Sequence, residues 1–132
     1  MNEDQIATFN QVTEIIYSDM VKQLAKPGQA IIDSLDASQA HNLHMAIGVA
    51  GEGGELLDAV KKSAIYQKPL DRENIIEELG DLEFYMEGLR QNLNISRQEC
   101  LDVNFKKLGK RYRGHKYSDQ QAQDRADKES SE

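Results

Sequence analysis

Two pairs of acidic residues, each enclosing glycine, are the part of this sequence best suited to chemistry. The first pair is Glu52 and Glu55, separated by two glycines, and the second is Glu78 and Asp81, separated by leucine and glycine. Residues three positions apart lie on the same face of a helix, so each pair would present two carboxylates side by side. Two antiparallel helices would bring the carboxylates of both pairs around one cavity.

Carboxylates crowded in this way repel one another and resist burial, and a hard divalent cation relieves both effects. Mg²⁺ takes oxygen ligands in an octahedron and usually retains water and substrate phosphates, and Mn²⁺ is the expected substitute. Two such ions can clamp the attacking and leaving oxygens of a phosphoryl displacement. Acidic pairs also occur on solvated helix faces, so the spacing alone leaves both interpretations open.

Amphipathic helices with short connections are expected to position these acids, which indicates an all-α fold of the four-helix bundle type. The expected helices span residues 2–24, 38–66, 72–93 and 96–112, and residues 29–37 form a short connection. The segment that carries the second acidic pair has the clearest apolar stripe, with spacings of four and three residues throughout. The members of this stripe are Ile75, Leu79, Leu82, Met86, Leu89 and Leu93.

Glycines at positions 48, 51, 53 and 54 interrupt the helix expected over residues 38–66. Each glycine costs a helix up to about 1 kcal/mol relative to alanine, so the cluster needs a physical reason. Two reasons remain open: a loop that cradles phosphate, or the close approach of a neighbouring helix or ligand to the backbone.

The last part of the chain, residues 113–132, contains almost no apolar residues. It is predicted to be a disordered or loosely attached tail, which leaves residues 1–112 as one helical domain. Such a tail cannot repay its ordering entropy within one subunit. Truncation after Gly114 is therefore expected to leave melting and activity nearly unchanged.

The acidic charge of the chain limits the classes of molecule that it can bind. A net charge of −7 makes nucleic acid and anionic membranes unfavourable partners, and cations must mediate contact with an anionic ligand. The single cysteine fits a reducing compartment. The first residues lack the basic and apolar regions of a signal peptide, and no apolar run approaches the ~20 residues of a membrane span. A cytoplasmic protein is expected.

Three stretches resemble the MazG-like all-α nucleoside triphosphate pyrophosphohydrolases: GEGGELLDAVKK, DRENIIEELGDLEFYMEGL and NFKKLGKRY. The family signature is an ExxE pair, a linker of variable length and an ExxD pair, which here fall on the two acidic pairs. The resemblance covers residues 39–112. Some members carry another acid just before the first pair, where this chain has Gly51, so the number of metal ions and the identity of the base stay open.

The resemblance implies Mg²⁺-dependent hydrolysis of a nucleoside triphosphate between its α and β phosphates, with deoxynucleotides favoured. The products are a nucleoside monophosphate and pyrophosphate, and the role is nucleotide pool cleaning or control. Glu52, Glu55, Glu78 and Asp81 would be the metal ligands. Glu52 or Glu55 would also take the proton of the attacking water.

Three aromatic or imidazole side chains are candidates for binding the nucleoside. Tyr85 lies on the same helix face as the second acidic pair and resembles a family tyrosine near the sugar, although a core aromatic is an equal alternative. His41 and His44 each precede one acid of the first pair by eleven residues. Because eleven residues bring a helix almost back to the same face, both histidines are expected to line the base pocket.

Basic and amide side chains are candidates for binding the phosphates. Asn104, Lys107 and Arg111 form a polar stripe on the last expected helix, where the two cations would bind phosphate oxygens and Asn104 a phosphate or a base edge. A solvated face is the alternative for this stripe. Lys62 ends the helix of the first acidic pair and is a further phosphate candidate, although a lysine is favourable there for electrostatic reasons alone.

Two other functions stay open beside the triphosphate hydrolase. One is a non-catalytic helical dimerisation module with an acidic surface, and the other is a relative that acts on a phosphoribosyl nucleotide. The apolar stripe of residues 75–93 is long, and one partner helix within the same subunit is not expected to cover all of it. A homodimer or a homotetramer built from two dimers is therefore expected, with the last helix of one subunit near the acids of the other.

Overall fold

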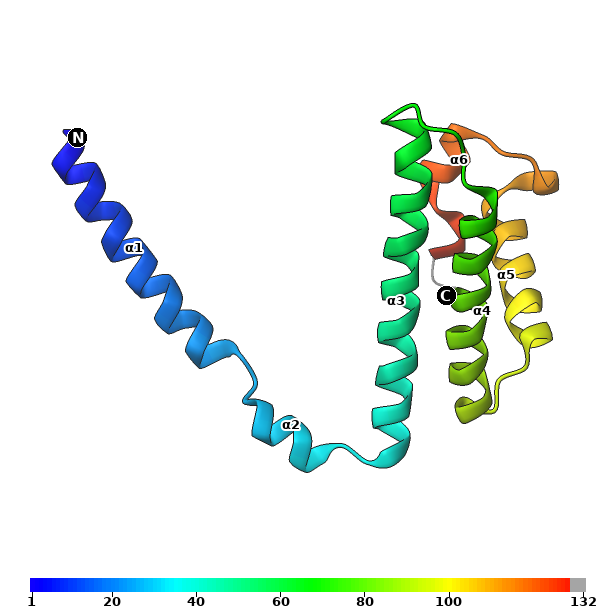
Figure 1. The fold of residues 1–132 in the computed structure, drawn as a ribbon, viewed down its shortest axis with the longest axis horizontal. Helices are drawn as coiled ribbons and strands as arrows, with labels where there is room; N and C mark the ends of the chain where they lie inside the picture. Colours follow the sequence, from blue (N-terminus) through cyan, green and yellow to red (C-terminus); the bar gives the residue numbers. More distant parts are fainter. Residues whose placement is uncertain (129–132) are drawn as a thin grey trace. The chain divides into compact units, whose positions relative to one another are not determined.

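A computed structural model describes residues 1–128, and all regular structure within this range is helical (Figure 1). The prediction of an all-α fold is confirmed. The chain divides into two compact units, Met1–Ala37 and Ser38–Glu132. No helix in the described range is long and apolar enough to cross a membrane.

The first unit consists of α1 (Glu3–Leu24) and α2 (Gly28–Ser34). The side chain of Asn2 accepts a hydrogen bond from the backbone N–H of Gln5, and the side chain of Gln5 accepts one from Asn2, which forms a capping box. α2 lies where the sequence indicated only a connection. Pro27 presets the backbone at its start, and seven residues are too few to show a helical period.

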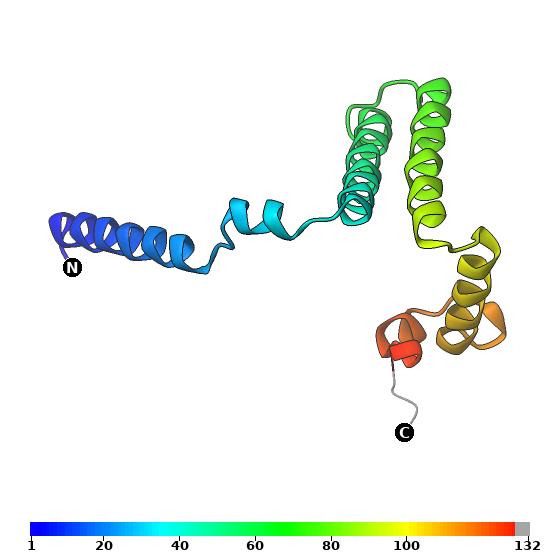
Figure 2. The same cartoon turned by 90° about the horizontal axis from the view of Figure 1, so that it is seen from below.

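The second unit is built on an antiparallel hairpin of α3 (Ala37–Ala64) and α4 (Arg72–Leu93), which lie side by side in both ribbon views (Figures 1 and 2). The carboxylate of Asp71 caps the start of α4 by accepting from the backbone N–H of Asn74 at 3.1 Å. Asn94 ends α4 in the left-handed conformation, with φ of 55°. The bounds of α4 match the predicted segment.

Polar side chains connect α3 and α4 at the end of the hairpin opposite to the loop that joins them. The amide nitrogen of Asn92 on α4 donates to the hydroxyl of Ser38 at 2.9 Å and to the side-chain oxygen of Asn42 at 2.6 Å. Both partners lie at the start of α3. The contact therefore joins the first turns of α3 to the last turns of α4 and fixes the pairing of the two helices.

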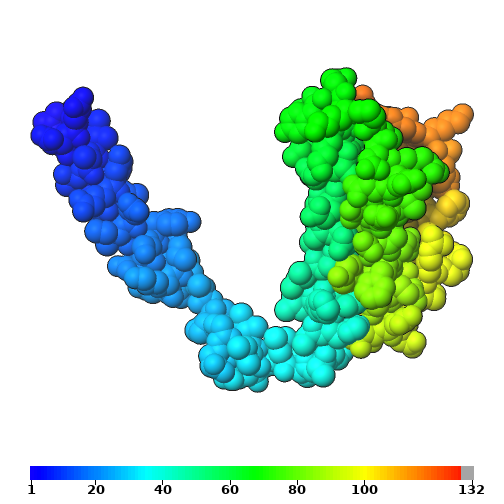
Figure 3. Space-filling model, in the orientation of Figure 1, coloured from blue at the N-terminus to red at the C-terminus, as the bar shows by residue number. Residues whose placement is uncertain are grey.

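α3 continues without interruption through its four clustered glycines, so the proposed phosphate-cradling loop is wrong. Close helix approach accounts for one of them, since the ring of Tyr85 on α4 lies against the backbone at Gly48. At Gly51, Gly53 and Gly54 an added Cβ would meet nothing within 4 Å. These three positions leave the α3 backbone accessible beside the first acidic pair. Figure 3 shows the side chains of α3 and α4 in contact along the hairpin.

Residues 113–128, for which a disordered or loosely attached tail was expected, lie against α5 (Arg97–Arg111) as a series of short helical elements (Figure 2). The elements are η1 (Arg113–His115), α6 (Asp119–Asp124) and η2 (Ala126–Lys128). The Phe105 and His115 rings stack with centroids 4.6 Å apart, and the backbone N–H of Arg113 donates to the side chain of Gln121 at 2.8 Å. The contacts are aromatic and polar, so a search for apolar stripes misses them. Residues 129–132 lie outside the described range.

Candidate metal centre

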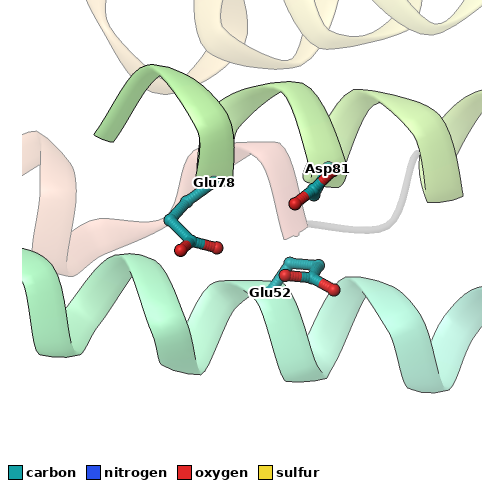
Figure 4. Close-up of side chains that lie close together, drawn as sticks. All are labelled: Glu52, Glu78 and Asp81. Carbon is teal, nitrogen blue, oxygen red and sulfur yellow. The ribbon is translucent and has the colours of Figure 1, made fainter. Parts of the chain in front are cut away.

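Three of the four expected acids come together where α3 and α4 face each other. Glu52 projects from α3, and Glu78 and Asp81 project from α4, with their carboxylates turned toward one another (Figure 4). One oxygen from each carboxylate lies within 4.8 Å of the others. The antiparallel pairing of the helices brings two parts of the sequence that are 26 residues apart, Glu52 and Glu78, to the same level of the hairpin.

The fourth acid, Glu55, lies outside this group of three but acts on it electrostatically. Partial burial is the main cause that raises the pKa of Glu78, and repulsion from the carboxylates of Glu52, Glu55 and Asp81 adds to it. The ionised form of Glu78 is therefore held in an unfavourable environment. A bound cation would remove that penalty.

The donor set fits a hard divalent cation. All three clustered side chains offer carboxylate oxygens, the ligand type that Mg²⁺ and Mn²⁺ prefer. Glu52 and Glu78 are half-buried and Asp81 is exposed, so the cluster is open on one side. Mg²⁺ usually keeps several positions for water and phosphate oxygens, and an open three-carboxylate group leaves room for them.

The residues expected to bind the nucleoside take part in the packing of the hairpin. The imidazole of His41 donates from Nε2 to the carbonyl oxygen of Gly88 at 3.2 Å. The His44 and Tyr85 rings meet edge to face with centroids 6.2 Å apart, and Tyr85 also meets Phe84 at 5.2 Å. All three expected residues thus lie on the α3–α4 hairpin, one to three turns from the acids.

Lys62 is paired with an acid of its own helix. Its ammonium group lies 2.8 Å from Asp58, and the same carboxylate lies 3.1 Å from Lys61. Hydrogen bonding to Lys62 and then to Lys61 lowers the pKa of Asp58, and the bond to Asp58 raises the pKa of Lys62. More than half of the Lys62 side chain is exposed, and surface pairs of this kind are weak enough to open toward a phosphate.

The polar stripe on α5 divides into two parts. Asn104 and Lys107 are exposed, whereas Arg111 makes a bidentate ion pair with Asp127 of η2, at 2.6 and 2.8 Å. The Asp127 side chain is 1% exposed. Hydrogen bonding between the two groups lowers the pKa of Asp127 and raises the pKa of Arg111. The guanidinium of Arg111 is thus bound to the C-terminal segment. The sequence pattern did not indicate Asp127 as its partner.

A family model described as the MazG nucleotide pyrophosphohydrolase domain matches residues 39–115 of the chain. No match was found among curated proteins or among solved structures. The matched region contains both acidic pairs, the complete α3–α4 hairpin apart from the first residues of α3, and all of α5. It covers more than half of the chain, which implies a nucleotide pyrophosphohydrolase activity. The chain belongs to the MazG nucleotide pyrophosphohydrolase family.

Proposed function

We propose that this protein hydrolyses nucleoside triphosphates between the α and β phosphates, in a Mg²⁺-dependent reaction that releases a nucleoside monophosphate and pyrophosphate. Deoxynucleotides are the favoured substrates, and nucleotide pool cleaning or control is the proposed role. The group of three carboxylates inside the family region is the observation that carries this proposal. In a chain of net charge −7, a cation is the means by which this acidic site attracts a triphosphate.

The acids divide into two roles. Glu52, Glu78 and Asp81 would hold Mg²⁺, with Glu55 as the fourth expected ligand. The bound ion would supply positive charge for the phosphate oxygens and a water of lowered pKa. Glu52 and Glu55 are the two candidates for the base. Glu52 belongs to the group of three carboxylates, and Glu55 lies outside it.

The other expected residues surround the two ends of the substrate. The nucleoside lies toward the part of the hairpin that carries the aromatic and imidazole side chains, and the phosphates lie at the acids. Lys62 and Lys107 are the exposed cations for the phosphates. The complete proposed set for substrate binding is His41, His44, Lys62, Tyr85, Asn104, Lys107 and Arg111, of which Arg111 would first have to leave Asp127.

Release of pyrophosphate from a nucleotide panel tests the function. The panel contains ribo- and deoxyribonucleoside triphosphates and a phosphoribosyl nucleotide, each with Mg²⁺ and with excess chelator. We expect pyrophosphate and a monophosphate in equal amounts from triphosphates with Mg²⁺, and none with chelator. If the phosphoribosyl nucleotide is the one substrate that is turned over, the protein is instead a phosphoribosyl-nucleotide pyrophosphohydrolase. No turnover of any member would support a non-catalytic module instead.

We also propose that the protein works as a homodimer or as a homotetramer of two dimers. Within residues 38–128 only Met45 and Ala59 are buried apolar residues, while Leu57, Phe84 and Phe105 are each about two-thirds exposed. Apolar surface of this extent marks an interaction face, and a second copy of the chain would cover it by a two-fold contact. Light scattering at micromolar concentration should give two or four times 14.9 kDa. A fully active species of one chain mass, or an odd-numbered ring, would refute the proposal.

A further inference from the structure

Two contacts set how closely α3 and α4 approach. At Gly48 an added methyl group would overlap Cγ, Cδ1 and Cε1 of the Tyr85 ring, and at Gly88 it would overlap the sulfur of Met45. In each contact a large side chain from one helix lies on the bare backbone of the other. Met45 is one of the few buried residues in the described range, at 6% exposure. At Gly88 the flexible end of the Met45 side chain can move aside. At Gly48 the overlap reaches Cγ at the base of the Tyr85 ring, so a larger residue there would displace the ring or the helix that carries it.

The Gly48–Tyr85 contact is the one next to the acids. Gly48 precedes Glu52 by four residues on α3, and Tyr85 follows Asp81 by four residues on α4. At 1.5 Å of rise per residue, the contact lies about 6 Å along the helices from the carboxylates. A change in the distance between α3 and α4 at the Gly48–Tyr85 contact would therefore also change the distance between the acids of the two helices, because a helix does not bend easily over one turn.

We propose that Gly48 is a positioning residue for the metal centre. Its lack of a side chain lets the Tyr85 ring lie against α3, and this contact holds Glu52 of α3 at ligand distance from Glu78 and Asp81 of α4. The inference rests on the proposed function, since it assumes that these acids bind metal. Mg²⁺ demands near-ideal octahedral geometry, so a small displacement of one helix costs affinity.

Gly51 offers a matched control on the same helix. A Cβ added at Gly51 would meet nothing within 4 Å. Alanine is the better helix former at both positions, so Gly48→Ala and Gly51→Ala change backbone propensity in the same direction. The two variants differ in the overlap with Tyr85, which only the first creates.

The experiment measures Mn²⁺ binding to the full chain without nucleotide, from the electron paramagnetic resonance signal of free Mn²⁺. The proteins are the wild type, Gly48→Ala, Gly51→Ala, Tyr85→Ala and the double variant Gly48→Ala/Tyr85→Ala, with helix content followed by circular dichroism. We expect Gly48→Ala to weaken Mn²⁺ binding about tenfold or more, as supporting-shell changes commonly do, and Gly51→Ala to leave it unchanged. Removal of the ring gives the new methyl group room, so the double variant should bind Mn²⁺ about as well as Tyr85→Ala.

The outcomes distinguish a failure of the positioning role of Gly48 from a failure of the proposed metal-dependent function. Equal Mn²⁺ affinity of the wild type and Gly48→Ala would overturn the positioning role while the metal centre stands. A double variant that binds clearly more weakly than Tyr85→Ala would also overturn it, because the overlap with the ring would then not be the cause. If Gly48→Ala fails to fold, a folded double variant with the affinity of Tyr85→Ala supports the role, and an unfolded one overturns it. A wild type that binds no Mn²⁺ would remove both proposals.

Discussion

Replacement of Asp81 by alanine should lower the turnover number by about 10³-fold or more while helix content stays unchanged, because a bound metal supplies several kcal/mol of transition-state stabilisation. Asp81 is exposed, so its removal creates no cavity. Asp81→Asn should lose nearly as much, because the amide keeps the size of the side chain but not its charge. Glu77→Ala is the matched control, since Glu77 is an exposed acid on the same helix outside the group of three. Near-wild-type turnover in Asp81→Ala would contradict the assignment.

Glu55→Ala measured in the same assay tells the two roles of this residue apart. If Glu55 is the base, turnover falls while Mn²⁺ affinity stays close to that of the wild type. If it is a metal ligand, turnover and Mn²⁺ affinity fall together, as expected for Asp81→Ala. Near-wild-type turnover in both Glu55→Ala and Asp81→Ala would show that the acidic pairs take no part in catalysis.

Long periodic elements and the acidic cluster could be predicted from the sequence. The bounds of α4 follow from the apolar stripe and from Asp71, whose type and position are those of a helix cap. Glu52, Glu78 and Asp81 could be placed together because helical spacing puts each pair on one face and a short connection makes α3 and α4 antiparallel. These inferences use only local geometry, which the residue spacing contains.

Contacts between distant residues could not be predicted in this way. The reason for glycine at position 48 is the ring of Tyr85, which lies 37 residues further along the chain. Arg111 looked like a free cation on a solvated face, and its partner Asp127 lies in a segment without an apolar stripe. Periodicity reports which face of a helix is buried, but not which polar groups meet across elements. The attachment of the C-terminal segment is ionic and aromatic, so an apolar stripe does not reveal it.

Asp127→Ala should lower the melting temperature at pH 7 by at least several degrees, because it leaves the guanidinium of Arg111 without its partner at a position where only 17% of the side chain is exposed. A chain that ends at His115 should show a similar loss, contrary to the sequence-based expectation for truncation. Asp124→Ala is the control, since Asp124 is exposed and, within residues 1–128, accepts a hydrogen bond from Gln120 of its own helix. Thermal unfolding followed by circular dichroism measures all three variants.

The acid dependence of the same pair gives this prediction a second measurement. The ion pair lowers the pKa of Asp127 in the folded protein, so its contribution to stability is fully present above the unfolded pKa of about 3.9 and is lost as pH falls through the lower folded value. The difference in melting temperature between the wild type and Asp127→Asn should therefore stay constant from pH 7 to about pH 5 and shrink only below about pH 4. A difference that is absent at pH 7, or that grows on acidification, would show that Asp127 does not hold the C-terminal segment through its charge.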